Sequence, residues 1–410
     1  MGLEQMEKGI NQFDQKHRNS WLIKKHLYLN SPISRVEIAH DLGLTTPVIT
    51  GIVSNLLADH VVREVDEPDL VEAKGAGRRR VMLEFNPDRY YICGVDLSPY
   101  HTNYVLTDLQ GHTLARRQTF RTLDEYSKTM EQLEQQIPDF WEECKIPRQK
   151  LLGVGIAMPG LINGSEGKIY TTFKEGWTQS DPAAGLKATL GTRVLLENNV
   201  RAKVICAEIF DRMVKSEPFL YFSISYGVAM QMIIDDKVLY GDSAAAGEIG
   251  HMVVQRDGPV CPTCGGRGCL EALAGERAVL NRCREAMEKN SGEHLWQLCS
   301  SPELLTMDQV LQAQADGDET VETMIQDALD YLGIALSNAV NLISPKAVVI
   351  DGRMFRLEKN QRYLLLAAER NMFRVHTNRI QFTFLPFDAY RGARAAAAVV
   401  VKDYLYNGIK

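Results

Sequence analysis

Three cysteines lying close together are the strongest chemical signal in the sequence. Cys261, Cys264 and Cys269 occupy a glycine-rich loop that is too short to fold on its own, and His251 precedes them. Three thiolates and one imidazole suit a tetrahedral zinc ion, and with all four positions filled no site remains for a reactive water. We therefore expect a structural Zn²⁺. The alternatives are a redox pair at Cys261 and Cys264, or free buried thiols, but redox pairs usually lack the third cysteine.

Two carboxylates flank this loop. Glu248 precedes it, and Glu271 follows it in Cys269-Leu-Glu271. Carboxylates paired with amides are the usual groups that bind sugar hydroxyls. Isolated surface groups are the alternative interpretation. We expect a pocket for a monosaccharide or a sugar phosphate, lined by these carboxylates, by two amides that follow an apolar segment and by the imidazole: Asn198, Asn199, Glu248, His251 and Glu271.

The first 86 residues show the pattern of a winged helix-turn-helix. Helices are predicted over residues 11–30, 34–42 and 45–57, followed by short strands over 61–65 and 80–85. Ser34-Arg-Val-Glu37 fits a capping box at the start of the second helix, which ends at Gly43. In this motif the third helix enters the major groove of DNA and the wing contacts the backbone or the minor groove.

The third helix has an apolar side and a polar side. We expect its inner face to consist of apolar residues, namely Val48, Ile52, Val53, Leu56 and Leu57. Contacts with double-stranded DNA are expected from polar residues of the helix-turn-helix and from the basic tip of the wing, namely Ser34, Thr45, Thr46, Thr50, Ser54, Arg78, Arg79 and Arg80. A three-helix protein-interaction module with a solvated charge run is the alternative.

Residues 87–410 alternate between strands and helices, which indicates an α/β architecture. The expected strands cover residues 90–97, 102–108, 151–157, 193–196, 221–224 and 346–350. The expected helices cover residues 127–144, 202–213 and 321–342. We find no internal repeat in the sequence.

Bulk properties narrow the class of protein. The net charge of −6 gives no global attraction to nucleic acid, so any DNA binding must come from local clusters of charge. No apolar run approaches the roughly 20 residues that span a bilayer, and residues 1–16 do not form a secretory signal. We therefore expect a cytoplasmic protein with no membrane partner. The eight cysteines do not suggest a disulfide framework.

Several of these motifs together resemble a known family. Gly247-Glu-Ile-Gly-His251, followed by the cysteine loop that ends in Gly268-Cys-Leu-Glu271, is similar to the signature of the ROK family of repressors, uncharacterised reading frames and sugar kinases. Residues 155–160 resemble its sugar-side loop, and Glu197-Asn198-Asn199 lies where its Glu-Asn-Asp motif falls. The family usually has one residue between the first two cysteines and this chain has two, which alters the loop without removing a ligand.

The resemblance covers essentially the whole chain and implies its domain organisation. It implies a winged helix-turn-helix over residues 1–86, as in the xylose-type and N-acetylglucosamine-type repressors of the family, with a wing similar to Gly77-Arg78-Arg79. It also implies a two-lobed domain of the actin and hexokinase class over residues 87–410, with the zinc loop at 251–271.

The nucleotide-handling elements of the family's kinases are degraded here. A phosphate loop of the pattern Asp-x-Gly-Gly-Thr-Lys is replaced by Asp96-Leu-Ser-Pro99-Tyr100-His101, and proline has no N–H to offer phosphate. The catalytic aspartate is replaced by Asn199, which cannot accept a proton. A second loop of the pattern Gly-Thr-Gly-x-Gly reads Ser225-Tyr-Gly-Val-Ala229. We expect a sensor without catalytic residues, and an ATP-dependent sugar kinase is the alternative.

These expectations combine into one hypothesis for function. The chain is expected to repress genes of carbohydrate metabolism by binding an operator as a homodimer or homotetramer. A sugar or sugar phosphate between the two lobes would shift the two DNA-binding heads relative to each other. The identity of the sugar, the direction of its effect and a possible additional protein partner stay open at this point.

Overall fold

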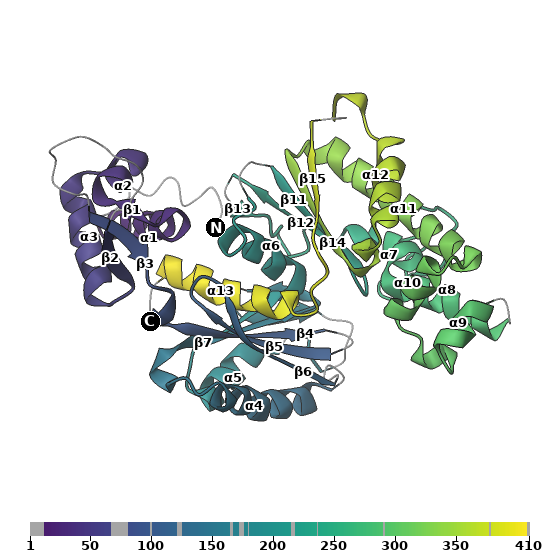
Figure 1. The fold of residues 1–410 in the computed structure, drawn as a ribbon, viewed down its shortest axis with the longest axis horizontal. Coiled ribbons are helices and arrows are strands. Elements are labelled where there is room, and N and C mark those ends of the chain that lie inside the picture. Colours follow the sequence, from purple (N-terminus) through teal and green to yellow (C-terminus); the bar gives the residue numbers. More distant parts are fainter. Residues whose placement is uncertain are drawn as a thin grey trace.

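The structure is a computed structural model, and the part of the chain that it describes consists of residues 12–66, 81–98, 101–120, 125–164, 167–171, 176–178, 180–214, 218–235, 237–289, 292–376 and 379–407. A small N-terminal head lies beside a larger body made of two lobes (Figure 1). Each lobe contains a five-stranded sheet with helices packed against it. None of the described helices is both long enough and apolar enough to cross a bilayer.

The head has the helix order that the sequence predicts. Its elements are α1 (Gln12–Asn30), β1 (Ile33–Ser34), α2 (Arg35–Leu42), α3 (Thr46–Ala58), β2 (Val62–Asp66) and β3 (Val81–Phe85). The three strands form one antiparallel sheet in the order β1-β3-β2. The capping box is present, because the Ser34 hydroxyl accepts from the backbone N–H of Glu37 while the Glu37 carboxylate accepts from the backbone N–H of Ser34. The predicted winged helix-turn-helix fold is therefore confirmed.

At the first turn of helix α3, the buried residue is not the one that the sequence predicts. Ile49, Val53 and Leu56 are buried, whereas Val48 is 37% exposed. Residues at positions i, i+4 and i+7 share one face of a helix, and Val48 lies about 100° away from that face. The prediction that Val48 belongs to the inner face is therefore wrong.

Lobe I is built on the first five-stranded sheet. Its strands are β4 (Tyr91–Leu97), β5 (His101–Asp108), β6 (Thr113–Phe120), β7 (Leu151–Met158) and β10 (Val194–Asn198), in the order β10-β7-β4-β5-β6. Helices α4 (Tyr126–Glu143) and α5 (Pro182–Leu190) cover one face, and α6 (Asn199–Ile209) and α13 (Arg391–Asn407) cover the other (Figure 1). A short hairpin of β8 (Leu161–Asn163) and β9 (Lys168–Thr171) follows β7.

Lobe II repeats the strand arrangement of lobe I. Its strands are β11 (Phe219–Ile224), β12 (Val228–Ile234), β13 (Lys237–Val238), β14 (Ala347–Gly352) and β15 (Gln381–Phe384), in the order β13-β12-β11-β14-β15. Its helices are α7 (Leu270–Ala274), α8 (Glu276–Glu288), α9 (Glu293–Leu298), α10 (Met307–Ala315), α11 (Glu319–Ile343) and α12 (Glu358–Glu369). In both sheets a three-stranded antiparallel meander adjoins a parallel pair of strands. The expected two-lobed α/β architecture is confirmed. The repeated strand arrangement is not accompanied by an internal repeat in the sequence.

Helix α13 returns from the end of the chain to lie directly on the sheet of lobe I. A Cβ atom at Gly155 would lie 1.9 Å from the carbonyl oxygen of Ala396, and one at Gly94 would lie 2.0 Å from that of Ala393. The helix backbone therefore contacts the strand backbone with no side chain between them. This close approach requires glycine at both strand positions.

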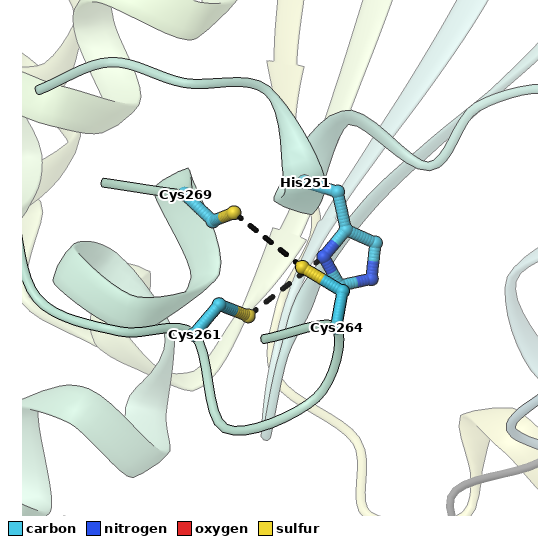
Figure 2. Close-up of side chains that lie close together, drawn as sticks. All are labelled: His251, Cys261, Cys264 and Cys269. Atoms are coloured by element: carbon cyan, nitrogen blue, oxygen red, sulfur yellow. Dashed lines mark hydrogen bonds between the residues drawn. The ribbon is translucent and has the colours of Figure 1, made fainter. Parts of the chain in front are cut away.

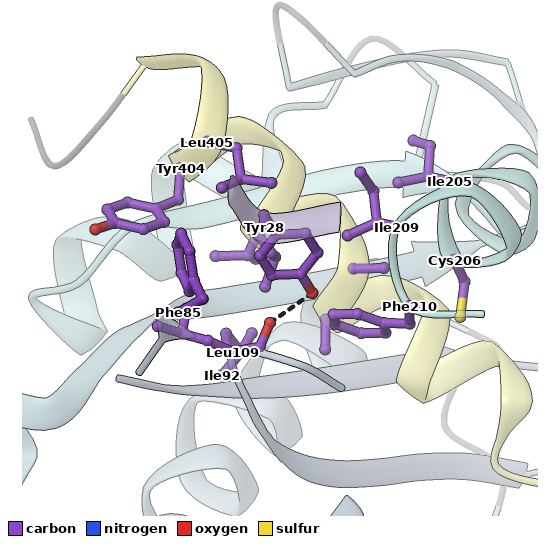
Figure 3. Close-up of a cluster of buried hydrophobic side chains, with 14 of the residues drawn as sticks. Tyr28, Phe85, Ile92, Leu109, Ile205, Cys206, Ile209, Phe210, Tyr404 and Leu405 are labelled. Carbon is purple, nitrogen blue, oxygen red and sulfur yellow. Dashed lines mark hydrogen bonds between the residues drawn. The ribbon is translucent and has the colours of Figure 1, made fainter. Parts of the chain in front are cut away.

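The head is packed against the body through a shared apolar core (Figure 3). Tyr28, near the end of α1, donates a hydrogen bond from its hydroxyl to the carbonyl oxygen of Leu109, at 2.7 Å. Its ring packs edge-on against Phe85, with 5.1 Å between the centroids. Side chains of α6 and α13, including Ile209 and Leu405, complete the cluster. We call this contact between α1, α6 and α13 the junction.

The close packing of α13 predicts a strong effect of one methyl group. Gly155→Ala is expected to lower the free energy of unfolding by 3 kcal/mol or more, roughly the upper end of overpacking costs, because the clash is with backbone that cannot rotate away. Urea unfolding measures this change. The matched control is Gly185→Ala in α5, where the nearest atom, the methyl carbon of Met130, lies 3.5 Å away, so that the variant should be at least as stable as the parent. Equal stability of both variants would contradict the packing.

Candidate metal centre and adjoining pocket

The four residues predicted to bind a metal converge in lobe II. The ligand atoms of His251, Cys261, Cys264 and Cys269 all lie within 4.8 Å of one another (Figure 2). The Cys264 and Cys269 sulfurs are 3.7 Å apart, and the Cys261 sulfur is 3.8 Å from His251 Nδ1. Zinc–sulfur bonds of about 2.3 Å in a tetrahedron place two sulfurs about 3.8 Å apart. The arrangement therefore fits a tetrahedral metal ion.

The loop is closed by its own backbone. Cys261 donates its backbone N–H to the carbonyl oxygen of Gly266 at 2.6 Å, and Gly265 donates to Cys261 at 2.9 Å. Gly268 has a φ of +70°, and a Cβ there would lie 1.6 Å from the carbonyl oxygen of Gln255. A hydrogen bond from the backbone N–H of Gly266 also lowers the pKa of the Cys264 thiol, which favours the thiolate form that metals bind.

A cavity of about 330 Å³ adjoins the metal centre, and we call it the sugar cavity. Its wall includes all five residues predicted to contact a sugar, namely Asn198, Asn199, Glu248, His251 and Glu271. Pro159 and Gly160, from the loop that the sequence assigned to the sugar side, also line it. Because His251 turns Nδ1 toward Cys261, its Nε2 is the ring nitrogen left for the cavity.

Asn198 shapes the sugar cavity more than it lines it. Its amide oxygen accepts from the backbone N–H groups of Val200 and Arg201, at 2.9 and 3.1 Å, and so caps helix α6. Its amide nitrogen donates to the carbonyl oxygen of Gly160 at 2.9 Å. Asn198 therefore fixes the start of α6 to the loop after β7, and this places its neighbour Asn199 in the wall of the cavity.

The two carboxylates of the cavity are held differently. No described residue donates a side-chain or backbone hydrogen to the Glu248 carboxylate, and burial raises its pKa. The Glu271 carboxylate accepts from the Thr263 hydroxyl at 2.5 Å and from Arg277 at 3.1 Å. Its other oxygen lies so close to Gly227 that a Cβ there would be 2.2 Å away. Glu248 is thus an open acceptor, whereas Glu271 is fixed in position.

Sequence reasoning missed two residues of this wall. Arg277 bonds Glu271 and stacks on the ring of Tyr226, with 4.9 Å from the guanidinium carbon to the ring centroid. Thr263 ties Glu271 to the cysteine loop. Arg277 lies in α8, Tyr226 in the turn between β11 and β12, and Thr263 in the metal loop, so no local pattern groups them. The sequence marked Tyr226 only as a replaced phosphate-loop residue.

A second cavity, of about 290 Å³, lies beyond Asn199, and we call it the acidic cavity. Asn199, Ser225 and Tyr226 line both cavities, so that the two adjoin. Burial raises the pKa of Asp96 to about 6 and that of Glu276 to about 7. Pro99 and Tyr100, which the sequence places in a lost phosphate loop, lie outside the described residues.

The predicted DNA-binding residues fall into three groups. Thr45, Thr46, Thr50 and Ser54 are exposed on or beside α3. Ser34 is only 4% exposed and its hydroxyl is bonded to Glu37, so it caps α2 and does not offer a surface contact, contrary to the prediction. Arg78, Arg79 and Arg80 lie outside the described residues.

Comparison with known proteins identifies the family. The sequence profile of the ROK family matches residues 92–399, which is most of the chain. The chain belongs to the ROK family. The xylose repressor of Bacillus subtilis (strain 168) is 30% identical to it over 337 residues, which cover 82% of each chain. The N-acetylglucosamine repressor of Escherichia coli O157:H7 is 24% identical over 402 residues, which cover 96% of this chain and 94% of that one.

Solved structures of ROK proteins share the fold. A ROK family transcriptional regulator described as a homologue of the E. coli MLC protein superposes with a TM-score of 0.79 at 22% identity, covering 96% of this chain and 98% of that one. A ROK glucokinase from Streptomyces griseus, solved with glucose and AMPPNP, gives a TM-score of 0.64 at 19% identity and covers 75% of this chain and 98% of its own. The first likeness extends to the head, and the second is confined to a part of the size of the body.

The buried carboxyl of Glu276 predicts a pH dependence of stability. Its pKa is about 7 in the folded chain and about 4.5 when it is exposed on unfolding, so the folded state binds the proton more tightly. Stability from this group is therefore present below pH 4.5 and is lost as the pH rises to 7. Relative to Glu276→Gln, the free energy of unfolding of the parent should fall by about 3 kcal/mol over that window. Denaturant unfolding at pH 4.5 and 7.5 tests this, and a constant difference would contradict it.

Proposed function

We propose that this chain is a sugar-responsive transcriptional regulator, most simply a repressor of genes for carbohydrate use. The observation that carries the proposal is that a helix suited to DNA and a cavity suited to a sugar occur in one chain. Helix α3 exposes Thr46 and Thr50, and the body of the same chain contains the sugar cavity. Beside that cavity, the segments that correspond to the phosphate loops of the family's kinases are substituted. Relatives named as xylose and N-acetylglucosamine repressors support the same conclusion. Such a protein acts on DNA in the cytoplasm.

In this proposal α3 is the helix that reads the major groove. Its apolar face at Ile49, Val53 and Leu56 is buried against the other elements of the head, which leaves Thr46 and Thr50 on the exposed side. Hydroxyl groups can bond base edges or phosphates. Two heads in a homodimer, or in a tetramer built from dimers, would contact half-sites about 34–36 Å apart. Arg78, Arg79 and Arg80 are proposed as phosphate contacts of the wing.

We propose that the sugar cavity binds without catalysis. Asn198, Asn199, Glu248, His251 and Glu271 would hold the hydroxyl groups of a monosaccharide. Asn199 can bond a hydroxyl but cannot take its proton, and loss of a general base typically costs about 10²–10⁴-fold in rate. Tyr226 fills the turn where a kinase of the family has a glycine-rich phosphate loop. The alternative, a working sugar kinase, requires sugar-dependent consumption of ATP.

The metal centre is proposed to hold a structural zinc ion. His251, Cys261, Cys264 and Cys269 would supply four ligands, so that the ion has no open position, and its contribution would be to fix the loop. Thr263 lies inside this loop and bonds Glu271, and His251 lines the sugar cavity. The loop therefore positions two of the five sugar-contacting residues.

Helix α6 is the proposed connection between the sugar cavity and the head. It begins in the cavity wall at Asn199 and ends beside the junction, where Glu208 pairs with Lys25 of α1 at 3.3 Å. Arg212, just after the helix, donates to the carbonyl oxygen of Tyr28 at 3.1 Å. Lys203 in its middle bonds Asp351 of lobe II at 2.8 Å. A change in the angle between the lobes would therefore move the head, provided that the sugar prefers one of the two states.

The direct test is fluorescence anisotropy on DNA from upstream of the gene and of neighbouring sugar-uptake genes, with a panel of monosaccharides. We expect tight, salt-sensitive binding that one sugar alters. Thr46→Ala should change the preference among base-pair variants by about 1–3 kcal/mol, whereas Thr323→Ala on α11 should not. Absence of sequence-selective binding with every sugar would contradict the proposal, as would sugar-dependent ATP turnover.

Removal of one thiolate tests the metal centre. Cys264→Ser is expected to abolish stoichiometric zinc, as measured by elemental analysis, and to weaken sugar binding at least about tenfold because Thr263 and His251 lose their support. The matched control is Cys144→Ser, which changes a cysteine of lobe I outside the cluster and should keep one zinc per chain. Full zinc content and unchanged sugar affinity in Cys264→Ser would rule out this role of the loop.

A further inference from the structure

The charges around the two cavities bear on which class of sugar can enter. The acidic cavity is lined by five carboxylates and by three lysine or arginine side chains. The carboxylates are Asp96, Glu276, Asp308, Asp351 and Asp388, and the cations are Lys203, Arg353 and Arg391. The formal balance is therefore −2 when all of them are ionised. This negative balance differs from that of a phosphate site, where cations or backbone N–H groups give the ligand a net positive surrounding.

Each cation of the acidic cavity already has an acidic partner. Lys203 Nζ lies 2.8 Å from a carboxylate oxygen of Asp351, and Arg391 Nε lies 3.4 Å from the other oxygen of that carboxylate. Arg353 is bonded to Asp308 at 2.6 Å. The Nε atoms of Arg353 and Arg391 are buried and have no hydrogen-bond partner among the described residues. A phosphate that approached either guanidinium would nevertheless also meet the carboxylate that is already paired with it.

Two acidic groups of this cavity accept no hydrogen bond from a lysine or arginine among the described residues. Glu276 is 3% exposed, and the nearest cationic atom that faces it, Arg353 Nε, is 4.0 Å away. Asp96 is 8% exposed and faces the same space from the end of β4. Charges in such a poorly solvated site are weakly screened, so they act strongly on a second anion. A phosphate monoester carries a charge of about −1.5 to −2 at pH 7.

Among the residues that the structure describes, the lining of the sugar cavity offers no positive side chain that is free of a carboxylate. Its ionisable lining beyond the metal ligands consists of Glu248, Glu271 and Arg277, and Arg277 is already bonded to Glu271. Tyr226, with Arg277 stacked on its ring, stands where the two cavities meet. The described lining of both cavities thus holds seven carboxylates against four lysine or arginine side chains.

We propose that the effector is an uncharged, unphosphorylated monosaccharide and that the paired cavities exclude sugar phosphates. The inference rests on the proposed function of the sugar cavity and narrows the class of its ligand. Hydroxyl groups can donate to Glu248 and to the fixed Glu271, as neutral sugars do. A phosphate group on the same sugar meets a described wall in which carboxylates outnumber cations and each cation already lies within 4.0 Å of a carboxylate.

The test compares each sugar with its own phosphate by calorimetry on the zinc-loaded full chain at pH 8, where Asp96 and Glu276 are both ionised. The panel contains xylose and xylose 5-phosphate, glucose and glucose 6-phosphate, and N-acetylglucosamine and its 6-phosphate. We expect one free sugar to bind and its phosphate to bind at least about 100-fold more weakly, as like charges brought together produce. Tighter binding of any phosphate than of its free sugar would overturn the proposal.

Charge removal shows whether the acidic cavity causes the exclusion. Glu276→Gln should narrow the difference between sugar and phosphate by about tenfold, and Asp96→Asn serves as the second variant if Glu276→Gln does not fold. The control is Glu369→Gln on the exposed side of α12, which should keep the full difference. An unchanged difference in both cavity variants would overturn the proposal.

The same panel, run with operator DNA, distinguishes a failure of the proposed effector class from a failure of the proposed regulator function. If only a sugar phosphate alters DNA binding, the regulator function stands and the proposed effector class is wrong. If DNA binding responds to a free sugar and not to its phosphate, both stand. If neither compound binds the chain or alters DNA binding, the function assigned to the sugar cavity fails, and the effector class fails with it.

Discussion

The arrangement of the molecule depends on helix α6, whose two ends are fixed to different parts of the chain. At its start, Asn198 caps the helix and the buried Arg201 bonds Glu197 and the carbonyl oxygen of Ala244, both at 2.8 Å. At its end, Glu208 pairs with α1 and also with Lys402 of α13. Eleven residues of helix span about 16 Å, so these two sets of contacts lie roughly three turns apart on one helix. Helix α6 therefore reaches from the wall of the sugar cavity to the contact with the head, and we propose that it transmits movement between them.

The sugar cavity and the acidic cavity adjoin in a fold that this chain shares with a ROK glucokinase solved with glucose and AMPPNP. In the kinases of this family a sugar and a nucleotide must meet, and the shared fold keeps two cavities side by side. In this chain the group between them is the amide of Asn199, and the turn beside it carries the bulky Tyr226. The neighbouring carboxylates Asp96 and Glu276 are buried and accept no hydrogen bond from a lysine or arginine among the described residues. In the proposed function, binding of hydroxyl groups depends on Glu248, Glu271 and the metal loop, which these replacements do not touch.

The sequence predicted those parts that follow local rules. The capping box at Ser34 and Glu37 and the apolar strands of both lobes each depend on a few consecutive residues. The spacing of the cysteines likewise identifies the metal ligands. The residues around Glu271 in the wall of the sugar cavity could not be predicted as a group. Arg277, Tyr226 and Thr263 meet only because three separate elements pack together. The packing of helix α13 on lobe I was not predicted, because its contacts with Gly94 and Gly155 are backbone contacts between residues that are 230 or more positions apart. Ser34 was predicted to contact DNA because sequence cannot show that its cap is buried.

Hydrogen–deuterium exchange of the full chain, with and without the effector sugar, tests most directly whether α6 connects the sugar cavity to the head. We predict that the sugar slows exchange at the start of α6, over residues 199–203, and also changes exchange at the end of α1, over residues 24–30. Those residues lie at the junction, away from the sugar cavity. A sugar that alters DNA binding while the change in exchange stays confined to the cavity wall would contradict the connection through α6.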